Sequence, residues 1–339
     1  RYFKEIPFKN VFFYLITLYS GSLVLYVNGI SRFYELLIVF GLFFVLLGIF
    51  FVLKSVENEK NKYLNLFWGS LFLALSVACR PIDLLISIII LPYIFSLLIK
   101  DIKEFKTNKL NLFKLILSVG IPYILVGISL MYYNYIRFDS PFEFGYKYQL
   151  TISNNSALST GWYTIFSGVF TNLFSFPKFN AEFPFIVNYN DVPTFYGYYY
   201  IENMLGGLFA VVPLCFIYFG IIKINKENIS KELKILIFTL FIVSIGISIV
   251  SVAMSGSVER YLMDYSWMFI IDSIIIFSII YNSFKHDETK NVMQNILYIT
   301  TIFTFIIALL FGIVSEKSFF KRISPNKYYE MEYTICFWE

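Results

Sequence analysis

The chain alternates between long apolar runs and short polar segments over its whole length. Most runs contain about 20 residues, the length of a helix that crosses the hydrocarbon core of a bilayer. The pattern therefore predicts an all-α, polytopic membrane protein. About nine transmembrane helices are expected, at residues 10–28, 31–53, 65–79, 81–99, 112–134, 201–222, 235–254, 261–282 and 292–314.

The composition agrees with this pattern. Hydrophobic residues make up 58% of the 339 residues and charged residues only 15%, which is typical of integral membrane proteins. The abundance of Ile, Lys, Asn, Phe and Tyr indicates a bacterial source. Cysteines occur only at positions 79, 215 and 336, a spacing that predicts neither a disulfide framework nor a metal site.

Positive charge predicts the orientation, because Lys and Arg concentrate in the cytoplasmic loops of membrane proteins. Seventeen of the 27 basic residues lie in alternate connecting segments, at 1–9, 54–62, 100–114, 223–234 and 285–290. We expect these segments to be cytoplasmic and the protein to lie in the plasma membrane.

The predicted domains follow from that orientation. Residues 1–314 form a transmembrane domain whose N-terminus is cytoplasmic, and residues 315–339 form an extracytoplasmic tail. One long outer loop covers about 135–200. Within it, the stretch 161–176 has the spacing of an amphipathic helix, with rings on one face and hydroxyls on the other. We expect this helix to lie at the outer interface, with its hydroxyl face toward a cavity.

Arginines are concentrated on the predicted outer side. Arg32, Arg80 and Arg260 fall at the N-termini of helices that run inward. A cation is electrostatically unfavourable there, because a helix N-terminus carries partial positive charge. Exposed N–H groups beside a guanidinium do, however, form a good phosphate site. The alternative is that these side chains extend to the phosphates of the outer leaflet.

Two of these arginines have acidic neighbours. In "ACRPIDLL" (78–85), Asp83 follows Arg80, either to orient it at an anion site or simply to neutralise it. In "GSVERYLMDYSWMFIID" (256–272), Arg260 and Asp264 lie four residues apart on one helix face. Asp272 lies two turns deeper, where an ionisable group has either a functional role or a hydrogen-bonded bracing role.

A third polar cluster, "YYNYIRFDSPFEFGYKYQL" (132–150), leaves the fifth predicted span. It places Arg137, Asp139 and Glu143 among many aromatic rings. Aromatic belts at the interface explain part of this composition. The charged residues suggest in addition a wall of a site for lipid phosphate and sugar.

Several chemistries are excluded by the sequence. The only histidine, His286, lies in a cytoplasmic loop, so outer-face catalysis by a Ser–His or Cys–His group is not expected. The sequence has no P-loop, Gly-rich nucleotide motif or zinc spacing. The net charge of +4 reflects topology and does not indicate nucleic-acid binding. The carboxylates, arginines and aromatics of the outer side suit a transfer reaction on a phosphorylated lipid that carries a sugar.

Three segments resemble the bacterial polytopic glycosyltransferases of the GT-C fold, related to protein mannosyltransferases and aminoarabinose transferases. They are the Arg-Pro hairpin "GSLFLALSVACRPIDLLISIIILP" (69–92), the stretch "YNYIRFDSPFEFGYKYQLT" (133–151) and the helix start "ERYLMDYSWMFIID" (259–272). The resemblance implies a polyprenyl-phosphate sugar donor and catalysis on the extracytoplasmic face. It implies a glycan, lipid or protein acceptor, and no cofactor; a divalent metal is left open.

In this family the catalytic base is an acid in the first outer loop. The first outer turn here, "YVNGIS" (26–31), contains no acid. We therefore expect the first helix and its catalytic loop to precede Arg1, which leaves the base unassigned, with Asp139 and Glu143 as candidates within the chain. The donor phosphate is expected to contact Arg80, Arg137 and Arg260. Supporting roles are expected for Asp83, Tyr261 and Asp264.

The expected reaction is a single displacement, in which an acid deprotonates the acceptor hydroxyl while arginines stabilise the departing lipid phosphate. Other functions remain open at this stage. They are a flippase or exporter of lipid-linked sugars, a polymerase or ligase of lipid-linked glycans, and an inactive member of the family.

Overall fold

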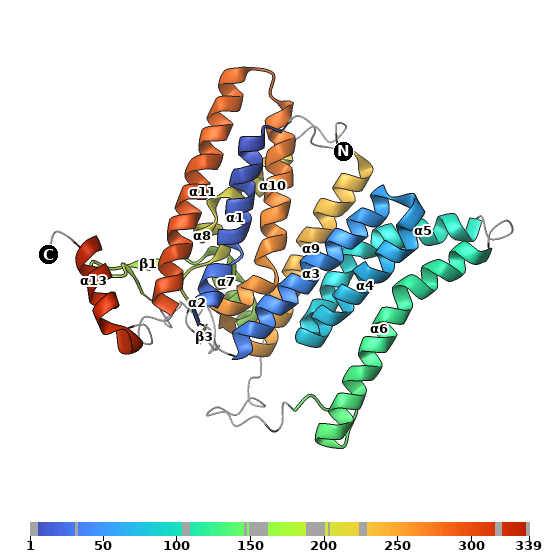
Figure 1. Cartoon of the computed structure of the whole chain (residues 1–339). Coiled ribbons are helices and arrows are strands. Elements are labelled where there is room, and N and C mark those ends of the chain that lie inside the picture. The colour runs from blue at the N-terminus through green and yellow to red at the C-terminus, as the bar shows by residue number, and fades with distance from the viewer. Residues whose placement is uncertain are drawn as a thin grey trace. The chain divides into compact units, whose positions relative to one another are not determined.

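The computed structural model describes residues 6–30, 33–103, 109–145, 148, 162–187, 201–202, 204–223, 229–315 and 321–336. These residues are predominantly helical, with only two-residue strands between the helices (Figure 1). Among them, seven helical stretches are long and apolar enough to cross a membrane: Tyr34–Glu57, Glu59–Cys79, Pro81–Ile99, Leu110–Phe138, Leu233–Ser255, Ser266–Ser283 and Asp287–Val314. The protein is thus a polytopic, helical membrane protein.

The chain divides into two compact units. The smaller unit is Leu37–Ser159, and the larger one combines Arg1–Leu36 with Thr160–Glu339. The described residues of the tail, 321–336, belong to the larger unit.

The smaller unit is a set of consecutive helical hairpins. Its elements are α3 (Phe33–Glu57, whose first turn belongs to the larger unit), η1 (Glu59–Asn61), α4 (Lys62–Cys79), η2 (Pro81–Ile90), α5 (Leu91–Lys103) and α6 (Lys109–Phe138). Helix α4 packs along α6. Helices α3 and α4 cross closely at two glycines, because a Cβ on Gly48 would lie 3.1 Å from the carbonyl oxygen of Gly69. Small residues that let backbones approach are the usual means of packing helices in lipid.

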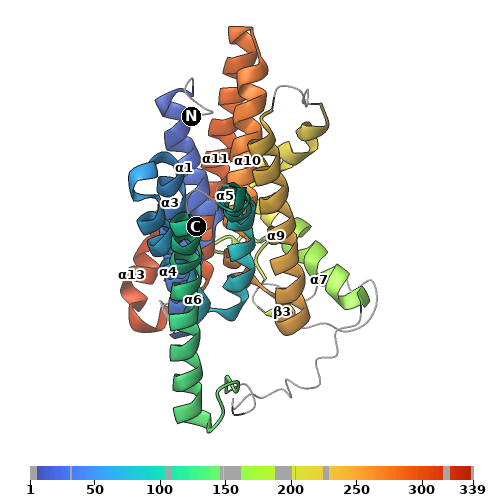
Figure 2. The same cartoon turned by 90° about the vertical axis from the view of Figure 1, so that its right-hand side faces the viewer.

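The larger unit contains most of the chain. Its elements are α1 (Phe8–Gly21), α2 (Val24–Ile30), α7 (Trp162–Phe174), β1 (Lys178–Phe179), β2 (Ile186–Val187), β3 (Ile201–Glu202), α8 (Leu208–Val211), η5 (Pro213–Lys223), α9 (Lys231–Ser255), β4 (Ser257–Val258), η7 (Glu259–Asp264), α10 (Ser266–Ser283), α11 (Asp287–Ser315) and α13 (Pro325–Ile335). It includes α9 and α10, which pack against each other (Figure 2).

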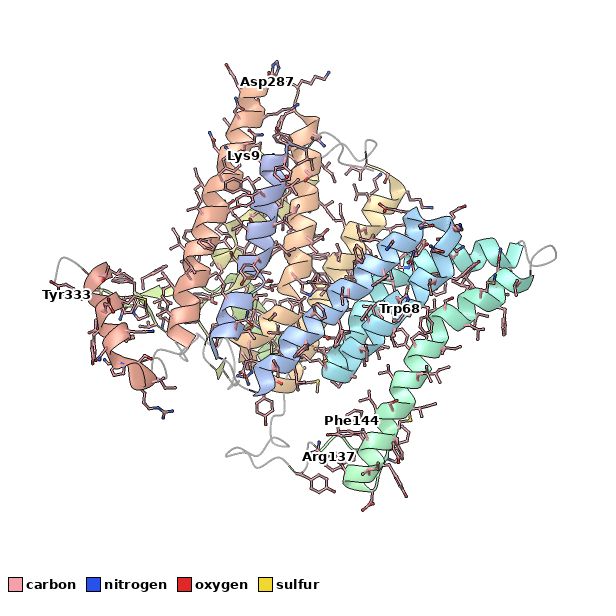
Figure 3. The ribbon with its side chains drawn as sticks, in the orientation of Figure 1. Lys9, Trp68, Arg137, Phe144, Asp287 and Tyr333 are labelled. Carbon is pink, nitrogen blue, oxygen red and sulfur yellow. The ribbon has the colours of Figure 1, made fainter. Side chains whose placement is uncertain are left out.

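Hydroxyl groups join three helices of the larger unit. The hydroxyls of Thr17 on α1 and Thr301 on α11 lie 2.7 Å apart, and Ser278 on α10 donates to the hydroxyl of Tyr14 on α1 at 3.2 Å. Such interhelical hydrogen bonds add to packing where the hydrophobic effect gives little driving force. The side-chain view places Lys9 and Asp287 toward the same end of this unit, at the starts of α1 and α11 (Figure 3). Both belong to segments predicted to share one side of the membrane.

Two predicted spans differ from single continuous helices. The span predicted at 10–28 breaks into α1 and α2, where Leu23 has a φ of 61°. The prediction of one continuous helix at 201–222 is also wrong. It begins as strand β3 and continues as the short helix α8 and the 3-10 helix η5. Pro213 explains the break after α8, because proline has no N–H for the helical hydrogen bond and clashes with the preceding turn.

Helix α7 occupies most of the stretch predicted to be amphipathic. Its small polar face, with Ser167, Thr171 and Asn172, is buried, whereas Phe166 and Phe170 are exposed. Gly168 lets this face pack against α9, since a Cβ at this position would clash with the side chain of Val252. Hydroxyls directed inward and rings directed outward are the arrangement expected beside lipid.

Candidate functional site

The acid–arginine cluster of the larger unit comprises Glu35, Glu259, Arg260, Tyr261 and Asp264. Glu35 lies in the first turn of α3, and the other four lie in η7, the 3-10 helix directly before the membrane-spanning helix α10. Acids are favoured in a first helical turn, because the exposed N–H groups there carry partial positive charge. The cluster is formed where two helices begin.

Arg260 is held by an acid and a ring. Its Nε atom lies 4.0 Å from Oε1 of Glu35, and its Cζ atom lies 5.0 Å from the centre of the Tyr261 ring. The side chain of Glu35 is only 5% exposed and that of Arg260 is 19% exposed. The second oxygen of Glu35, Oε2, is buried with no hydrogen-bond partner among the described residues. An ion pair with so little solvent is screened less than one on the surface.

Glu259, the residue before Arg260 in the sequence, is completely buried. Its Oε2 atom accepts hydrogen bonds from the backbone N–H groups of Leu205 at 2.9 Å and Gly206 at 3.5 Å. Burial raises the pKa of this carboxyl to about 8, and the two N–H groups lower it only in part. Its Oε1 atom has no hydrogen-bond partner within the described part of the chain.

The backbone donors of Glu259 are positioned by a close approach of two segments. Strand β3 pairs in parallel with β4, and the following residue pair Gly206–Gly207 passes the end of α7. The N–H of Gly207 donates to the carbonyl of Ser175 at 2.7 Å. A Cβ on Gly207 would lie 2.6 Å from the backbone nitrogens of both Phe174 and Ser175, so only glycine fits without a shift.

Gly207→Ala is expected to destabilise the protein, because the added methyl group forces two backbone segments apart. We expect a loss of about 1 to 3 kcal/mol in the free energy of unfolding. Gly246→Ala is the matched control, since a Cβ on this glycine of α9 meets no described atom within 4 Å. It should be neutral or stabilising by up to about 1 kcal/mol. Melting temperatures of the two variants in detergent give the comparison; equal values would contradict it.

Asp264 ends η7 and is buried at 6% exposure. Its carbonyl oxygen accepts a hydrogen bond from the indole Nε1 of Trp267 at 3.2 Å. This contact fixes the corner between η7 and α10, so Asp264 and Tyr261 are held on a rigid turn next to Arg260.

Arg80 and Asp83 form a second group, in the smaller unit. Arg80 is the extended residue between α4 and η2, and its carbonyl accepts from the N–H of Asp83 at 3.0 Å. The Asp83 side chain is buried at 3% exposure and packs onto α3, where a Cβ on Gly41 would lie 2.9 Å from Oδ2. The predicted hairpin is therefore present, with its acid directed into the unit.

Arg137, in the last turn of α6, forms the third group with Asp139 and Glu143, which follow the end of that helix. Figure 3 labels Arg137. The Nη1 atom of Arg137 donates to the hydroxyl of Tyr133 at 2.7 Å, and its Cζ atom lies 4.9 Å from the centre of the Phe138 ring. Arg137 and Asp139 are exposed, and Asp139 ends the helix with a φ of 53°. Glu143 accepts from the N–H of Gly145 at 3.0 Å.

The predicted site residues thus lie in three local groups. The structure brings Arg260, Tyr261 and Asp264 together and adds two acids that the sequence analysis did not single out, Glu35 and Glu259. Glu35 was recognisable as a lone acid in the first turn of a predicted span, and Glu259 as the neighbour of Arg260. Arg32 lies outside the described residues.

Asp272 is a buried bracing residue within α10. It is completely buried, and its Oδ2 atom accepts a hydrogen bond from the hydroxyl of Tyr218 on η5 at 2.7 Å. This bond links α10 to the irregular segment that precedes α9. The geometry agrees with the bracing role considered for this residue.

Within the described ranges, no group of three or more His, Cys, Asp or Glu residues is arranged to hold a metal ion. Comparison of the chain with protein-family models, curated proteins and solved structures finds no match.

Proposed function

We propose that the protein is a membrane glycosyltransferase of the GT-C type that acts on a polyprenyl-phosphate sugar at the extracytoplasmic face of the plasma membrane. The observation that carries the proposal is the Arg260–Glu35 ion pair beside Tyr261, at the point where η7 leads into the membrane helix α10. A lipid-linked substrate needs such a placement, because its phosphate lies at the end of a membrane-spanning bundle while its prenyl chain stays in lipid.

Three members of the cluster, Arg260, Tyr261 and Glu35, have a role in this proposal. A guanidinium is a planar group with five N–H donors, and the contact with Glu35 engages its Nε side, so one side chain can hold both a carboxylate and a phosphate. The Tyr261 ring offers an apolar face for a sugar. Glu35 fixes the orientation of Arg260, and its second oxygen can accept a proton.

The reaction is a displacement at the anomeric carbon of the donor. The acceptor hydroxyl oxygen forms the new bond, its proton passes to a carboxylate, and the bond to the lipid phosphate breaks. The phosphate leaves with the electron pair and is stabilised by Arg260, because a fixed cation acts strongly on charge that develops in a site with little water. Glu35 is our candidate for the proton acceptor in this cluster.

Export of a lipid-linked sugar is the alternative function. An exporter needs polar groups along a path through the membrane. Asp272 is an acid within a span, but its hydrogen bond with Tyr218 ties it to a neighbouring segment. This contact favours a structural role over a transport path.

The test is a transfer assay with membranes that contain the protein. A panel of radiolabelled polyprenyl-phosphate hexoses and pentoses is added, and lipid, glycan and protein fractions are separated. We expect label from one donor to enter an acceptor fraction together with release of polyprenyl phosphate. Membranes without the protein are the control. Label that crosses the bilayer while still attached to the donor would support export and contradict the proposal.

A further inference from the structure

Segment η2 of the smaller unit is a 3-10 helix of unusual length. It covers the ten residues from Pro81 to Ile90 and leads directly into the α-helix α5. Runs of 3-10 helix longer than about four residues are uncommon, because their hydrogen bonds are less well aligned than those of an α-helix. After Pro81 the segment contains neither proline nor glycine, so its sequence also permits an α-helix. Contacts with neighbouring helices must therefore set the 3-10 winding.

Two side chains of η2 make contacts of this kind. The hydroxyl oxygens of Ser87 and of Tyr123 on α6 lie 2.5 Å apart and share a hydrogen bond. Tyr123 also packs against the core cluster that contains Ile90, the last residue of η2. Asp83 is buried against a different helix, α3, where its Oδ2 atom occupies the space beside Gly41.

The two contacts suit a 3-10 helix better than an α-helix. Asp83 and Ser87 lie four residues apart in η2. Around a 3-10 helix such positions differ by about 120°, whereas around an α-helix they differ by only about 40°. As an α-helix, η2 would turn Asp83 and Ser87 toward one side and lose one of the contacts with α3 and α6. The 3-10 winding and this pair of contacts thus depend on each other.

We infer that η2 is a two-state segment, held as a 3-10 helix by the Ser87–Tyr123 hydrogen bond and rewound as an α-helix when that bond opens. A 3-10 helix rises about 2.0 Å per residue and an α-helix about 1.5 Å, so rewinding shortens η2 by about 5 Å. It also turns the first residue by about half a turn relative to the last. Arg80, a predicted phosphate contact, directly precedes η2, so the two states place this arginine differently within the smaller unit.

Spin-label distances in the purified full-length chain test this inference without any transfer assay. The labels are attached through Leu84→Cys in η2 and Ile102→Cys in α5, two exposed positions, after the three native cysteines have been replaced by alanine. Ser87→Ala and Tyr123→Phe each remove one hydroxyl of the hydrogen bond. Both should shorten the distance between the labels by about 3 Å, because the part of η2 between them then rises less per residue.

Two further variants are the controls. Ser87→Thr keeps a hydroxyl at this position and should retain the longer distance. Ser96→Ala should retain it as well, since Ser96 on α5 donates to the carbonyl of Tyr93 in its own helix at 2.7 Å. An unchanged distance in both Ser87→Ala and Tyr123→Phe would overturn the inference, because the winding would then be set without the hydrogen bond. Equal shortening in Ser96→Ala would overturn it too, because the loss of any serine hydroxyl would then have the same effect.

Discussion

Arg260→Ala is expected to reduce sugar transfer by about 100-fold or more, the effect of removing a fixed charge from a site where an anion develops. The variant also leaves Glu35 buried without its cation. Because Arg260 retains some contact with solvent, we expect the loss of its charge to lower the free energy of unfolding by about 1 to 3 kcal/mol. Breaking a fully buried pair would lower it more. The measurements are the transfer rate and the melting temperature of the same preparation.

A double variant separates the lost reaction from the lost stability. Glu35→Gln combined with Arg260→Ala removes both charges, so the melting temperature should return toward that of the wild type while transfer stays as low as in Arg260→Ala. Arg137→Ala is an informative comparison, because Arg137 is exposed and contacts rings of its own helix. Arg322→Ala, an exposed arginine beside α13, is the neutral control. Transfer at the wild-type rate in Arg260→Ala would remove the cluster from the proposed site.

The helices of this protein are predictable from sequence because apolar length alone specifies a span. Seven of the predicted spans correspond to long apolar helices in the structure. The segment 201–222 shows where this signal fails. Its residues are as apolar as those of a spanning helix, but Pro213 and the pair at 206–207 allow other backbone conformations. Tertiary contacts then decide between them, here the approach of Gly207 to the end of α7.

The candidate site was predictable only where its residues are close in sequence. Arg260, Tyr261 and Asp264 share one short helix, and their spacing alone places them together. Glu35 reaches Arg260 from more than 200 positions away, and a single sequence contains no signal for that contact. Glu259 was overlooked for another reason. Its function in the fold depends on backbone N–H groups of residues 205 and 206, which no side-chain pattern reveals.

Glu259 gives the second large effect, a dependence of stability on pH. The residue lies in η7, outside the seven spanning helices, and its pKa in the folded protein is about 8, above the usual value of 4.5. The folded state therefore holds a proton that the unfolded state releases between these two values. Stability from this group is complete below pH 4.5, decreases as pH rises toward 8, and is lost above it.

Glu259→Gln and Glu259→Ala divide this effect into its parts. Glutamine keeps an oxygen for the N–H groups of Leu205 and Gly206 but does not titrate. The free energy of unfolding of this variant should match that of the wild type near pH 5. As pH rises, it should exceed the wild-type value by at most about 1.4 kcal/mol for each pH unit. Alanine leaves both N–H groups buried without an acceptor and should be destabilised by about 3 kcal/mol or more at pH 5.

The measurement is the melting temperature of the three proteins from pH 5 to pH 9. The difference between wild type and Glu259→Gln cancels the titration of groups common to both proteins. Parallel curves for these two proteins would show that Glu259 is already ionised at pH 5. Burial would then be outweighed by the two backbone hydrogen bonds, and the carboxylate would be a permanent negative charge one residue from Arg260.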